Sequence, residues 1–203
     1  MTCCPAVAAR FLLLLALALP AGGCTVWGAA AGAGAVGATA AQTEKGVHRS
    51  ISDTEIRIAI NDRWLQADEV IFRKVNLQVQ EGRVLLTGNV DLPEQRVEAV
   101  RLAWQAPGVR EVINEIEVND TSGLGNLARD TWISTQLRST LLFDSEVSAI
   151  NYSIETVNQA IYLMGVAQSQ QELDRVIGHA KDIAYVRRVV SYVLLKNDPA
   201  RTS

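Results

Sequence analysis

The second half of this chain repeats the first at a fixed spacing, and this repeat limits the possible folds more than any other feature. A shift of 77 residues aligns the two copies without a gap. Matched positions carry the same or similar side chains, as in Asp53 and Asp130, Ile56 and Ile133, Ile60 and Leu137, Leu65 and Leu142, Gly88 and Gly165, and Val112 and Val189. We therefore expect two similar domains in tandem.

Each copy reads as a helix, two strands, a second helix and a third strand. Ile56, Ile60 and Trp64 recur every four residues and predict a first helix with one apolar face. Asp53 is placed to cap this helix, as Asp130 is in the second copy. Alternating apolar residues predict the strands, which we expect over 75–79, 84–90 and 112–118, and over 150–154, 161–166 and 189–195.

The second helix of each copy follows a capping-box spacing. The spacing runs from Asp91 to Glu94 in the first copy and from Ser169 to Glu172 in the second. A glycine-containing joint over 119–127 separates the copies. The order of elements predicts an α+β fold in each copy.

Two short motifs connect both copies to a known family. The second strand ends in Leu86-Thr87-Gly88-Asn89-Val90, and in Leu163-Met164-Gly165-Val166 in the copy. A Gly-Val step follows as Pro107-Gly108-Val109, but the second copy has Ala184-Tyr185-Val186. These residues resemble the BON domain (bacterial OsmY and nodulation domain). The resemblance implies a three-stranded mixed sheet with two helices (αββαβ) in each unit, no catalysis, and binding of anionic phospholipid.

The domain organisation follows from the repeat and the resemblance. We expect a first BON domain over 50–120 and a second over 128–197. Glycine at the end of a strand permits positive φ or a close approach of another backbone. We therefore expect Gly88 and Gly165 to be structural residues rather than contact residues.

Residues 1–23 read as an export signal that ends at a lipid-attachment site. The apolar run over 11–19 is too short to span a bilayer but fits a signal peptide. Ala21-Gly22-Gly23-Cys24 resembles the lipobox of bacterial lipoproteins, with Ala21 where that motif usually has leucine. The resemblance implies cleavage before Cys24 and acylation of its sulfur, with palmitate among the acyl chains. Ordinary cleavage, or a buried free thiol, is the alternative.

The cysteine count agrees with this interpretation. Cys3 and Cys4 lie in the signal, so Cys24 is the only cysteine left after cleavage, and no internal disulfide is possible. Two or more acyl chains give stable anchoring. Residues 24–49 are rich in Gly and Ala and predict a flexible tether. By resemblance, Thr25 after the cysteine implies sorting to the outer membrane, with the protein facing the periplasm.

The composition argues against several other classes of protein. Lys and Arg number 19 against 22 Asp and Glu, which disfavours a nucleic-acid partner. Two histidines and three cysteines disfavour a metal centre, and no cofactor motif is present. His179 and Asp182 could meet on a helix, but no nucleophile is tied to them. We therefore expect no catalytic residues and no enzyme activity.

The first helix of the second copy carries an aromatic stripe that the first copy lacks. The stripe holds Trp132, Gln136, Ser139 and Phe143, where the first copy has Glu55, Ala59, Asp62 and Gln66. Aromatic side chains beside a core face suit a membrane interface, and Arg129 and Arg138 could contact lipid phosphates. Packing of the aromatics against the first unit or the joint is the alternative.

The charge is also divided between the copies. Residues 53–120 hold 8 Lys/Arg and 13 Asp/Glu, whereas residues 129–203 hold 8 of each. Anionic lipid would repel the first unit more than the second. The sequence thus predicts a lipid-anchored protein that binds anionic phospholipid through its second unit and supports outer-membrane integrity. A protein-interaction scaffold of the cell envelope is the alternative.

Overall fold

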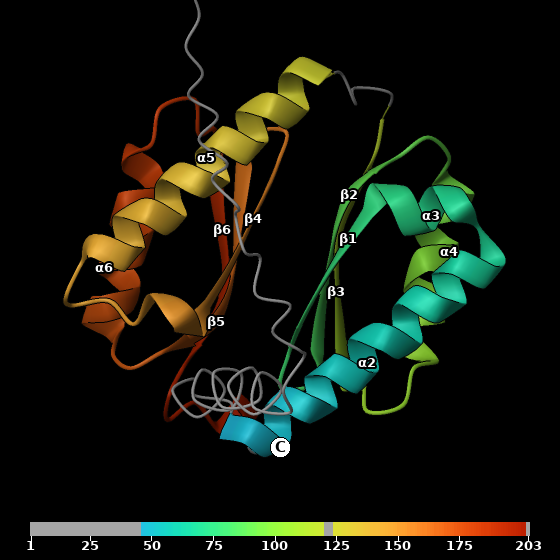
Figure 1. Cartoon of the computed structure of the whole chain (residues 1–203), viewed down its shortest axis with the longest axis horizontal. Helices are drawn as coiled ribbons and strands as arrows, with labels where there is room; N and C mark the ends of the chain where they lie inside the picture. The colour runs from blue at the N-terminus through green and yellow to red at the C-terminus, as the bar shows by residue number, and fades with distance from the viewer. Residues whose placement is uncertain (1–45, 120–123, 202–203) are drawn as a thin grey trace, which may run out of the picture.

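A computed structural model of the chain describes residues 46–119 and 124–201. It contains two units, each a three-stranded sheet with helices on one face (Figure 1). The sheets face each other in the middle of the molecule and the helices lie outside them. The expected signal peptide, Cys24 and the tether up to residue 45 lie outside the described residues.

The first unit has its helices and strands in the predicted order, with one addition. Its elements are α2 (Gly46–Ala67), α3 (Glu69–Lys74), β1 (Val75–Gln80), β2 (Arg83–Val90), α4 (Pro93–Trp104) and β3 (Glu111–Val118). The second unit repeats this order as α5 (Leu124–Phe143), η1 (Ala149–Asn151), β4 (Tyr152–Val157), β5 (Ala160–Ala167), α6 (Gln170–Asp182) and β6 (Arg188–Leu195), and ends in η2 (Pro199–Arg201).

Both sheets have the same mixed topology. Strand β2 is central, antiparallel to β1 and parallel to β3, and β5 holds the same place between β4 and β6. The register pairs Val75 with Gly88 and Tyr152 with Gly165, so the two hairpins are equivalent. The predicted α+β class, with two αββαβ units, is confirmed.

Two segments before the hairpins differ from the prediction. The additional helix α3 forms because the Asp68 side chain accepts a hydrogen bond from Val70 N at 2.7 Å, and because Ile71 is buried in the core. In the second unit the strand begins at Tyr152, two residues later than expected, because Ile150 lies in the 3₁₀ turn η1. Helix α5 also begins inside the expected joint, at Leu124.

The aspartates expected to cap the first helices have another role. Helices α2 and α5 begin several residues earlier, so Asp53 and Asp130 lie within them. The Asp53 carboxylate instead accepts hydrogen bonds from the backbone N–H groups of Glu81 and Gly82, both at 2.9 Å. Asp130 binds the β4–β5 turn in the same way, at 2.7 and 2.8 Å. Both turns have positive φ at their two central residues, and each aspartate fixes its hairpin to the helix above it.

The caps of the second helices differ between the units. Ser169 accepts a hydrogen bond from Glu172 N at 3.2 Å, as the capping-box spacing predicted. In the first unit the prediction was wrong, because α4 begins at Pro93. There Gln95 Oε1 accepts hydrogen bonds from Asp91 N and Leu92 N at 3.3 Å, so Gln95 takes the role expected of Glu94.

Gly88 and Gly165 sit where another backbone crosses closely. Gly88 has φ +124°, and a Cβ atom there would lie 2.2 Å from the carbonyl oxygen of Lys74. At Gly165, with φ +154°, the corresponding distance to Asn151 O is 2.0 Å. Any side chain at these positions would force the start of the first hairpin strand away from its partner.

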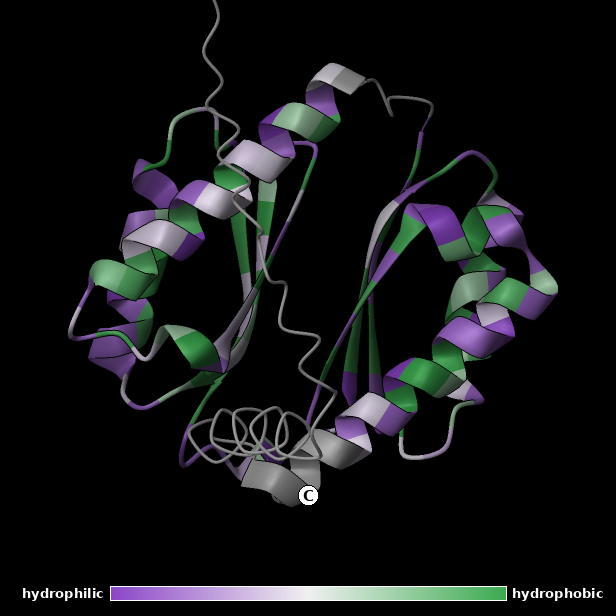
Figure 2. Ribbon diagram, in the orientation of Figure 1, coloured by the Kyte–Doolittle hydropathy of each residue, from purple (hydrophilic) through white to green (hydrophobic). Residues whose placement is uncertain are grey.

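Each unit has its own apolar core between helices and sheet (Figure 2). In the first unit Ile56, Ile60 and Trp64 of α2 pack on β2, and Trp64 Nε1 donates to Ala99 O of α4 at 3.1 Å. In the second unit Ile133 and its neighbours one and two turns on take the same positions on α5. The predicted apolar helix faces are therefore the core faces.

A third apolar cluster joins the two units across the faces of the sheets that are free of helices. Leu85 of β2 meets Tyr162 and Met164 of β5, together with Val157 and Ala160. Every residue of β5 is buried, because α5 and α6 cover one face and the first unit covers the other. The two units therefore share an interface through their sheets.

Polar contacts surround this apolar cluster. The Arg201 guanidinium reaches from the C-terminal end to the Glu81 carboxylate at 2.7 and 3.1 Å, and both side chains are buried. Arg83 donates to Tyr192 O at 2.9 Å. Tyr192 in turn donates to Glu115. Acidic residues of the first unit thus bind partners in the second.

Candidate lipid-binding surface

Helix α5 carries large apolar side chains on the side away from its core face. Ile133, Leu137 and Leu141 are fully buried against the sheet. Trp132 is 45% exposed and Phe143 is 90% exposed, so the structure places both aromatics of the predicted stripe at the surface. Neither side chain is needed to seal the core of the second unit.

Tyr185 was not among the predicted site residues, but it contacts Trp132 at the surface. It lies between α6 and β6, is 63% exposed, and its ring stands edge-on to Trp132 with centroids 5.9 Å apart. The Arg129 guanidinium carbon lies 5.5 Å from the centroid of the same ring, a cation–π distance. Arg129, Trp132 and Tyr185 together form what we call the aromatic cluster.

The backbone at Tyr185 explains why this residue is unusual. Its φ of +70° is left-handed, and the equivalent residue of the first unit is Gly108 with φ +87°. A side chain in this conformation costs about 1–2 kcal/mol, so the fold itself favours glycine here. The available signal was the replacement of glycine by tyrosine in the second copy of the motif.

The four predicted lipid-binding residues do not all lie together. Trp132 and Phe143 share one side of α5, three turns or about 16 Å apart along the axis. Arg129 is next to Trp132 through Tyr185. Arg138 lies instead on another side of α5, where its Nη2 donates to Ile154 O of β4, in the same unit, at 2.7 Å and its side chain lines a cleft between the units.

Other cations near the cluster fall into two groups. Lys181 and Arg187 are exposed and lie on either side of Tyr185 in the chain. Arg175 is bound by Asp144 and Glu146 at 2.6 and 2.7 Å, and Arg188 donates to Tyr162 Oη at 2.8 Å. Lys181 and Arg187 are therefore exposed cations within four residues of Tyr185 in the chain.

An ion cluster ties the end of α5 to α6. Asp144 Oδ2 accepts hydrogen bonds from Arg175 Nε at 2.6 Å and from His179 Nε2 at 2.7 Å. The hydrogen bond from Arg175, and then that from His179, hold the pKa of Asp144 well below its usual range. The pairing of His179 with Asp182, considered from the sequence, is thus replaced by a contact with Asp144 that fixes the helix end beside Phe143.

A notch of about 240 Å³ lies between α5 and α6, beside Trp132. Gln136 and Thr140 line it from α5, and His179 and Asp182 line it from α6. Among residues 46–119 and 124–201 there is no helix long and apolar enough to cross a bilayer, and no group of His, Cys, Asp and Glu side chains that could hold a metal ion.

Comparison with known proteins assigns the family. The family model of the BON domain matches residues 52–120 and 129–197, one match in each unit. The chain therefore belongs to the BON domain family and carries two copies of the domain.

Three relatives extend this comparison. The chain is 45% identical over 152 residues to an "Uncharacterized protein in gshII 5'region" of Anaplasma centrale, covering 74% of this chain and 99% of that protein. It is 29% identical to the outer membrane lipoprotein DolP of Haemophilus influenzae, covering 89% of this chain and 93% of the relative. It is 26% identical to the osmotically-inducible protein Y of Escherichia coli, covering 68% of this chain and 70% of that protein.

Proposed function

We propose that this protein is a non-enzymatic lipoprotein of the outer membrane that binds anionic phospholipid through its second BON domain. The observation that carries the proposal is the exposed aromatic cluster with Phe143 on the same side of α5. Trp and Tyr favour the headgroup level of a bilayer, where the ring is partly dry and its polar edge stays hydrated. Arg129, Lys181 and Arg187 supply positive charge for lipid phosphates.

The comparison between the two domains supports the choice of the second. At the positions of Trp132, Phe143 and Tyr185 the first domain has Glu55, Gln66 and Gly108. A carboxylate at the position of the tryptophan would be repelled by an anionic headgroup. The first domain would then act as a brace for the second or as a site for another protein.

The membrane anchor is part of the same proposal. Acylation of Cys24 after cleavage of residues 1–23 would hold the protein on the periplasmic side of the outer membrane, and the tether would give the domains reach. The description of the Haemophilus influenzae relative as an outer membrane lipoprotein supports this location. In this setting the protein would support the integrity of the outer membrane.

Flotation of residues 46–203 with lipid vesicles tests the docking surface. We expect flotation with vesicles that contain phosphatidylglycerol and not with phosphatidylcholine alone. Trp132→Glu should lower the bound fraction by at least about tenfold, because a buried charge replaces an interfacial ring. Flotation of the wild type with neither vesicle would contradict the proposal.

Trp104→Glu in the first domain is the matched control. Trp104 is 51% exposed, close to the exposure of Trp132, and lies on α4 of the first domain. We expect this variant to float like the wild type. Circular dichroism should first show that all three proteins are folded, and an equal loss from both substitutions would argue against the second domain as the docking domain.

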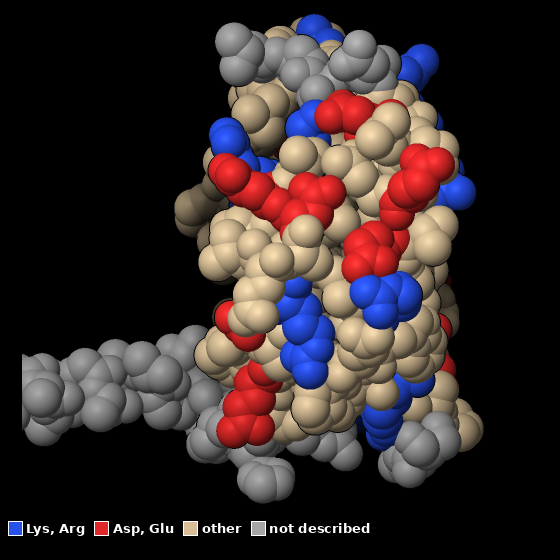
Figure 3. All heavy atoms as spheres, turned by 90° about the vertical axis from the view of Figure 1, so that its right-hand side faces the viewer, with Lys and Arg blue, Asp and Glu red and all other residues tan. Residues whose placement is uncertain are grey.

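A protein-interaction scaffold is the second candidate, favoured by the outer face of the first domain. Two helices of this domain each expose a pair of large apolar side chains seven residues apart: Ile58 and Leu65 on α2, and Val97 and Trp104 on α4. Figure 3 shows this helical face with acidic and basic side chains intermixed over an uncharged surface. Under this candidate Trp104→Glu would abolish capture of an envelope protein by the full chain and leave vesicle flotation unchanged.

A further inference from the structure

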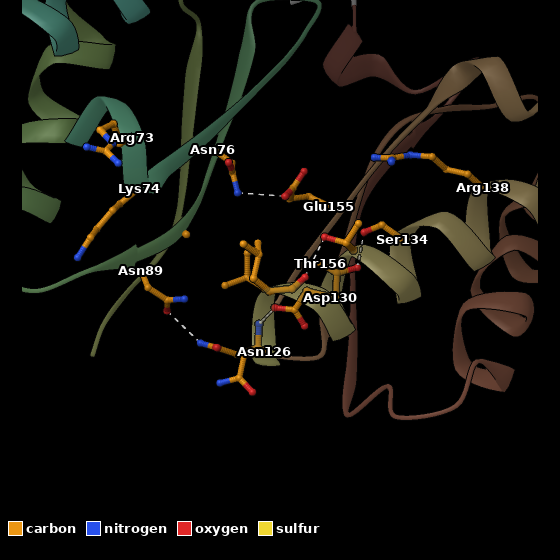
Figure 4. Close-up of a pocket in the computed structure, with 15 residues that line it drawn as sticks. Arg73, Lys74, Asn76, Asn89, Asn126, Asp130, Ser134, Arg138, Glu155 and Thr156 are labelled. Atoms are coloured by element: carbon orange, nitrogen blue, oxygen red, sulfur yellow. Dashed lines mark hydrogen bonds between the residues drawn. The ribbon is translucent and has the colours of Figure 1, made fainter. Parts of the chain in front are cut away.

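A polar cleft separates the two domains beside the edge strands β1 and β4. The apolar cluster around Leu85 and Met164 fills part of the space between the two sheets. Beside the edge strands, residues of both domains line a cavity of about 400 Å³. A second cavity of about 390 Å³ shares Asn76, Arg138 and Glu155 with the first. The two cavities thus form one continuous cleft, whose first part is drawn in Figure 4.

Most of the residues that line the cleft carry hydrogen-bonding side chains, although carbon atoms make up more of its exposed wall than nitrogen and oxygen atoms do. The first domain contributes amides such as Asn76 and Asn89, and the second contributes the hydroxyls of Ser134 and Thr156. Apolar side chains are few. A ligand that fits this wall needs donors and acceptors spread over its surface, because each polar group that leaves water must find a new partner.

Glu155 is the centre of the cleft. Its carboxylate accepts a hydrogen bond from Asn76 Nδ2 at 3.0 Å (Figure 4) and another from Gln78 Nε2 at 3.3 Å, and both bonds join the two domains. A carboxylate has about four acceptor positions, so it can accept further bonds from a ligand. Arg138 reaches into the cleft from the side of the second domain. Burial raises the pKa of Glu155, and the charge of Arg138 opposes that rise.

The shared fold does not require these side chains. Where the first domain has Asn89, the second has Val166, which is fully buried. Where the second has Glu155 and Arg138, the first has Gln78 and Asn61. The polar wall is therefore specific to the place where the two domains meet.

The cleft carries charges of both signs, with Arg57 and Arg138 beside Asp130 and Glu155, and this mixture disfavours a phosphate as the occupant. The Lys74 ammonium is paired with Asp91 at 2.7 Å, and the Arg73 guanidinium lies 3.5 Å from Glu69. Glu155 at the centre would repel an anion. Neutral ligands rich in hydroxyl groups fit better, because carboxylate, guanidinium and amide groups can each bind neighbouring hydroxyls.

We propose that this interdomain cleft binds a neutral saccharide, with Glu155 and Arg138 as its principal contacts and Asn76 and Asn89 beside them. The proposal is independent of lipid docking, since the aromatic cluster is on another side of α5. Leu127 at the rim is exposed and offers an apolar surface for one face of a sugar ring. Binding would also tighten the contact between the two domains.

Isothermal titration calorimetry on the full chain tests this proposal, in a detergent without a sugar headgroup. The probes are maltotriose, triacetylchitotriose and inorganic phosphate. We expect at least one oligosaccharide to bind with a dissociation constant below about 1 mM, and phosphate not to bind. Glu155→Ala should weaken binding by at least about tenfold.

Two further variants guard against a loss that merely reflects unfolding. Asn89→Val introduces the residue that the second domain carries at the same strand position, so it should fold and still weaken saccharide binding. Glu146→Ala removes an exposed carboxylate far from the cleft and should bind like the wild type. No oligosaccharide binding up to about 10 mM, equal binding by Glu155→Ala and the wild type, or binding of phosphate alone would overturn the proposal.

Discussion

At single residues, the positive-φ positions show where backbone geometry determines the side chain and where it does not. Gly88 and Gly165 occupy sites where a Cβ atom would overlap the carbonyl oxygen of the residue just before the neighbouring strand. Tyr185 occupies a left-handed site that glycine holds in the first domain. The glycines are explained by local sterics, whereas no backbone constraint calls for the tyrosine, whose ring stands edge-on to Trp132.

Alanine substitutions distinguish a glycine that has no room for a Cβ atom from a glycine that has open space around it. Gly88→Ala should lower the free energy of unfolding by about 3 kcal/mol or more, because its Cβ would meet a backbone oxygen. Gly178→Ala is the matched control: it lies on α6 with open space around it and should raise stability by about 0.5–1 kcal/mol. Urea unfolding of both variants measures the change in the free energy of unfolding. A Gly88→Ala protein as stable as the wild type would contradict the prediction, because the backbone at Lys74 would then move aside for the Cβ atom without cost.

Tyr185→Gly tests whether tyrosine at this position serves stability or binding. Relief of the left-handed strain, about 1 kcal/mol, should offset the lost edge contact with Trp132, so stability should change by less than about 1 kcal/mol. Flotation with anionic vesicles should nevertheless fall by severalfold. A large loss of stability with unchanged flotation would instead make Tyr185 a packing residue.

At the level of elements, α2 and α5 have equivalent core faces but different solvent-exposed faces. Their core faces match, with Ile56 and Ile60 on α2 and Ile133 and Leu137 on α5. Each also holds its hairpin through an aspartate carboxylate. Only the outer face of α5 carries the tryptophan of the aromatic cluster, and the junction of α5 with α6 is fastened by Asp144.

The Asp144 junction should make stability depend on pH. Because the folded pKa of Asp144 is lowered, its carboxylate stabilises the folded state fully above the unfolded pKa of about 4, and this contribution is lost gradually as the pH falls from that value toward the lower folded pKa. Asp144→Asn should therefore be less stable than the wild type at pH 7, and the difference should shrink toward pH 3. Thermal unfolding across this range tests the prediction, and a difference that stays constant with pH would contradict it.

At the scale of the whole molecule, the two domains bury the free faces of their sheets against each other. This arrangement explains why β5 is buried along its entire length. It also gives the acidic excess of the first domain a structural use, since Glu81 and Glu115 bind Arg201 and Tyr192 across the interface. The helices of both domains are left outside (Figure 1), and Trp132 and Tyr185 of the aromatic cluster are exposed to solvent.

Arg201→Ala tests the strength of the interface. Removal of the guanidinium leaves the Glu81 carboxylate buried and without this cation, a change that typically lowers stability by about 3–5 kcal/mol. Arg187→Ala, at an exposed position, should change stability by less than about 0.5 kcal/mol. Chemical denaturation of both variants gives the comparison, and an equally small effect at Arg201 would mean that the C-terminal contact is dispensable.

Several features of the fold and site were predictable from the sequence because they rest on local periodicity. The period of the apolar residues gave the core faces of α2 and α5, the repeat gave the two units, and the resemblance to the BON domain implied the mixed sheets. Asp53 was misread as a cap because its partners, the N–H groups of the β1–β2 turn, lie 28 and 29 residues away. Arg138 was grouped with Trp132, although its side chain reaches the other side of the helix toward Ile154.

By itself, the sequence determined the two-unit plan, the resemblance to the BON family and the order of the strands and of the helices other than α3. These properties depend on patterns that repeat every two or four residues and on glycines that tolerate no side chain. Only the tertiary structure decided that Tyr185 joins Trp132, that the sheets face each other and that a polar cleft lies between them. Those contacts join segments far apart in the chain, and their geometry depends on how whole elements pack, which no local pattern encodes.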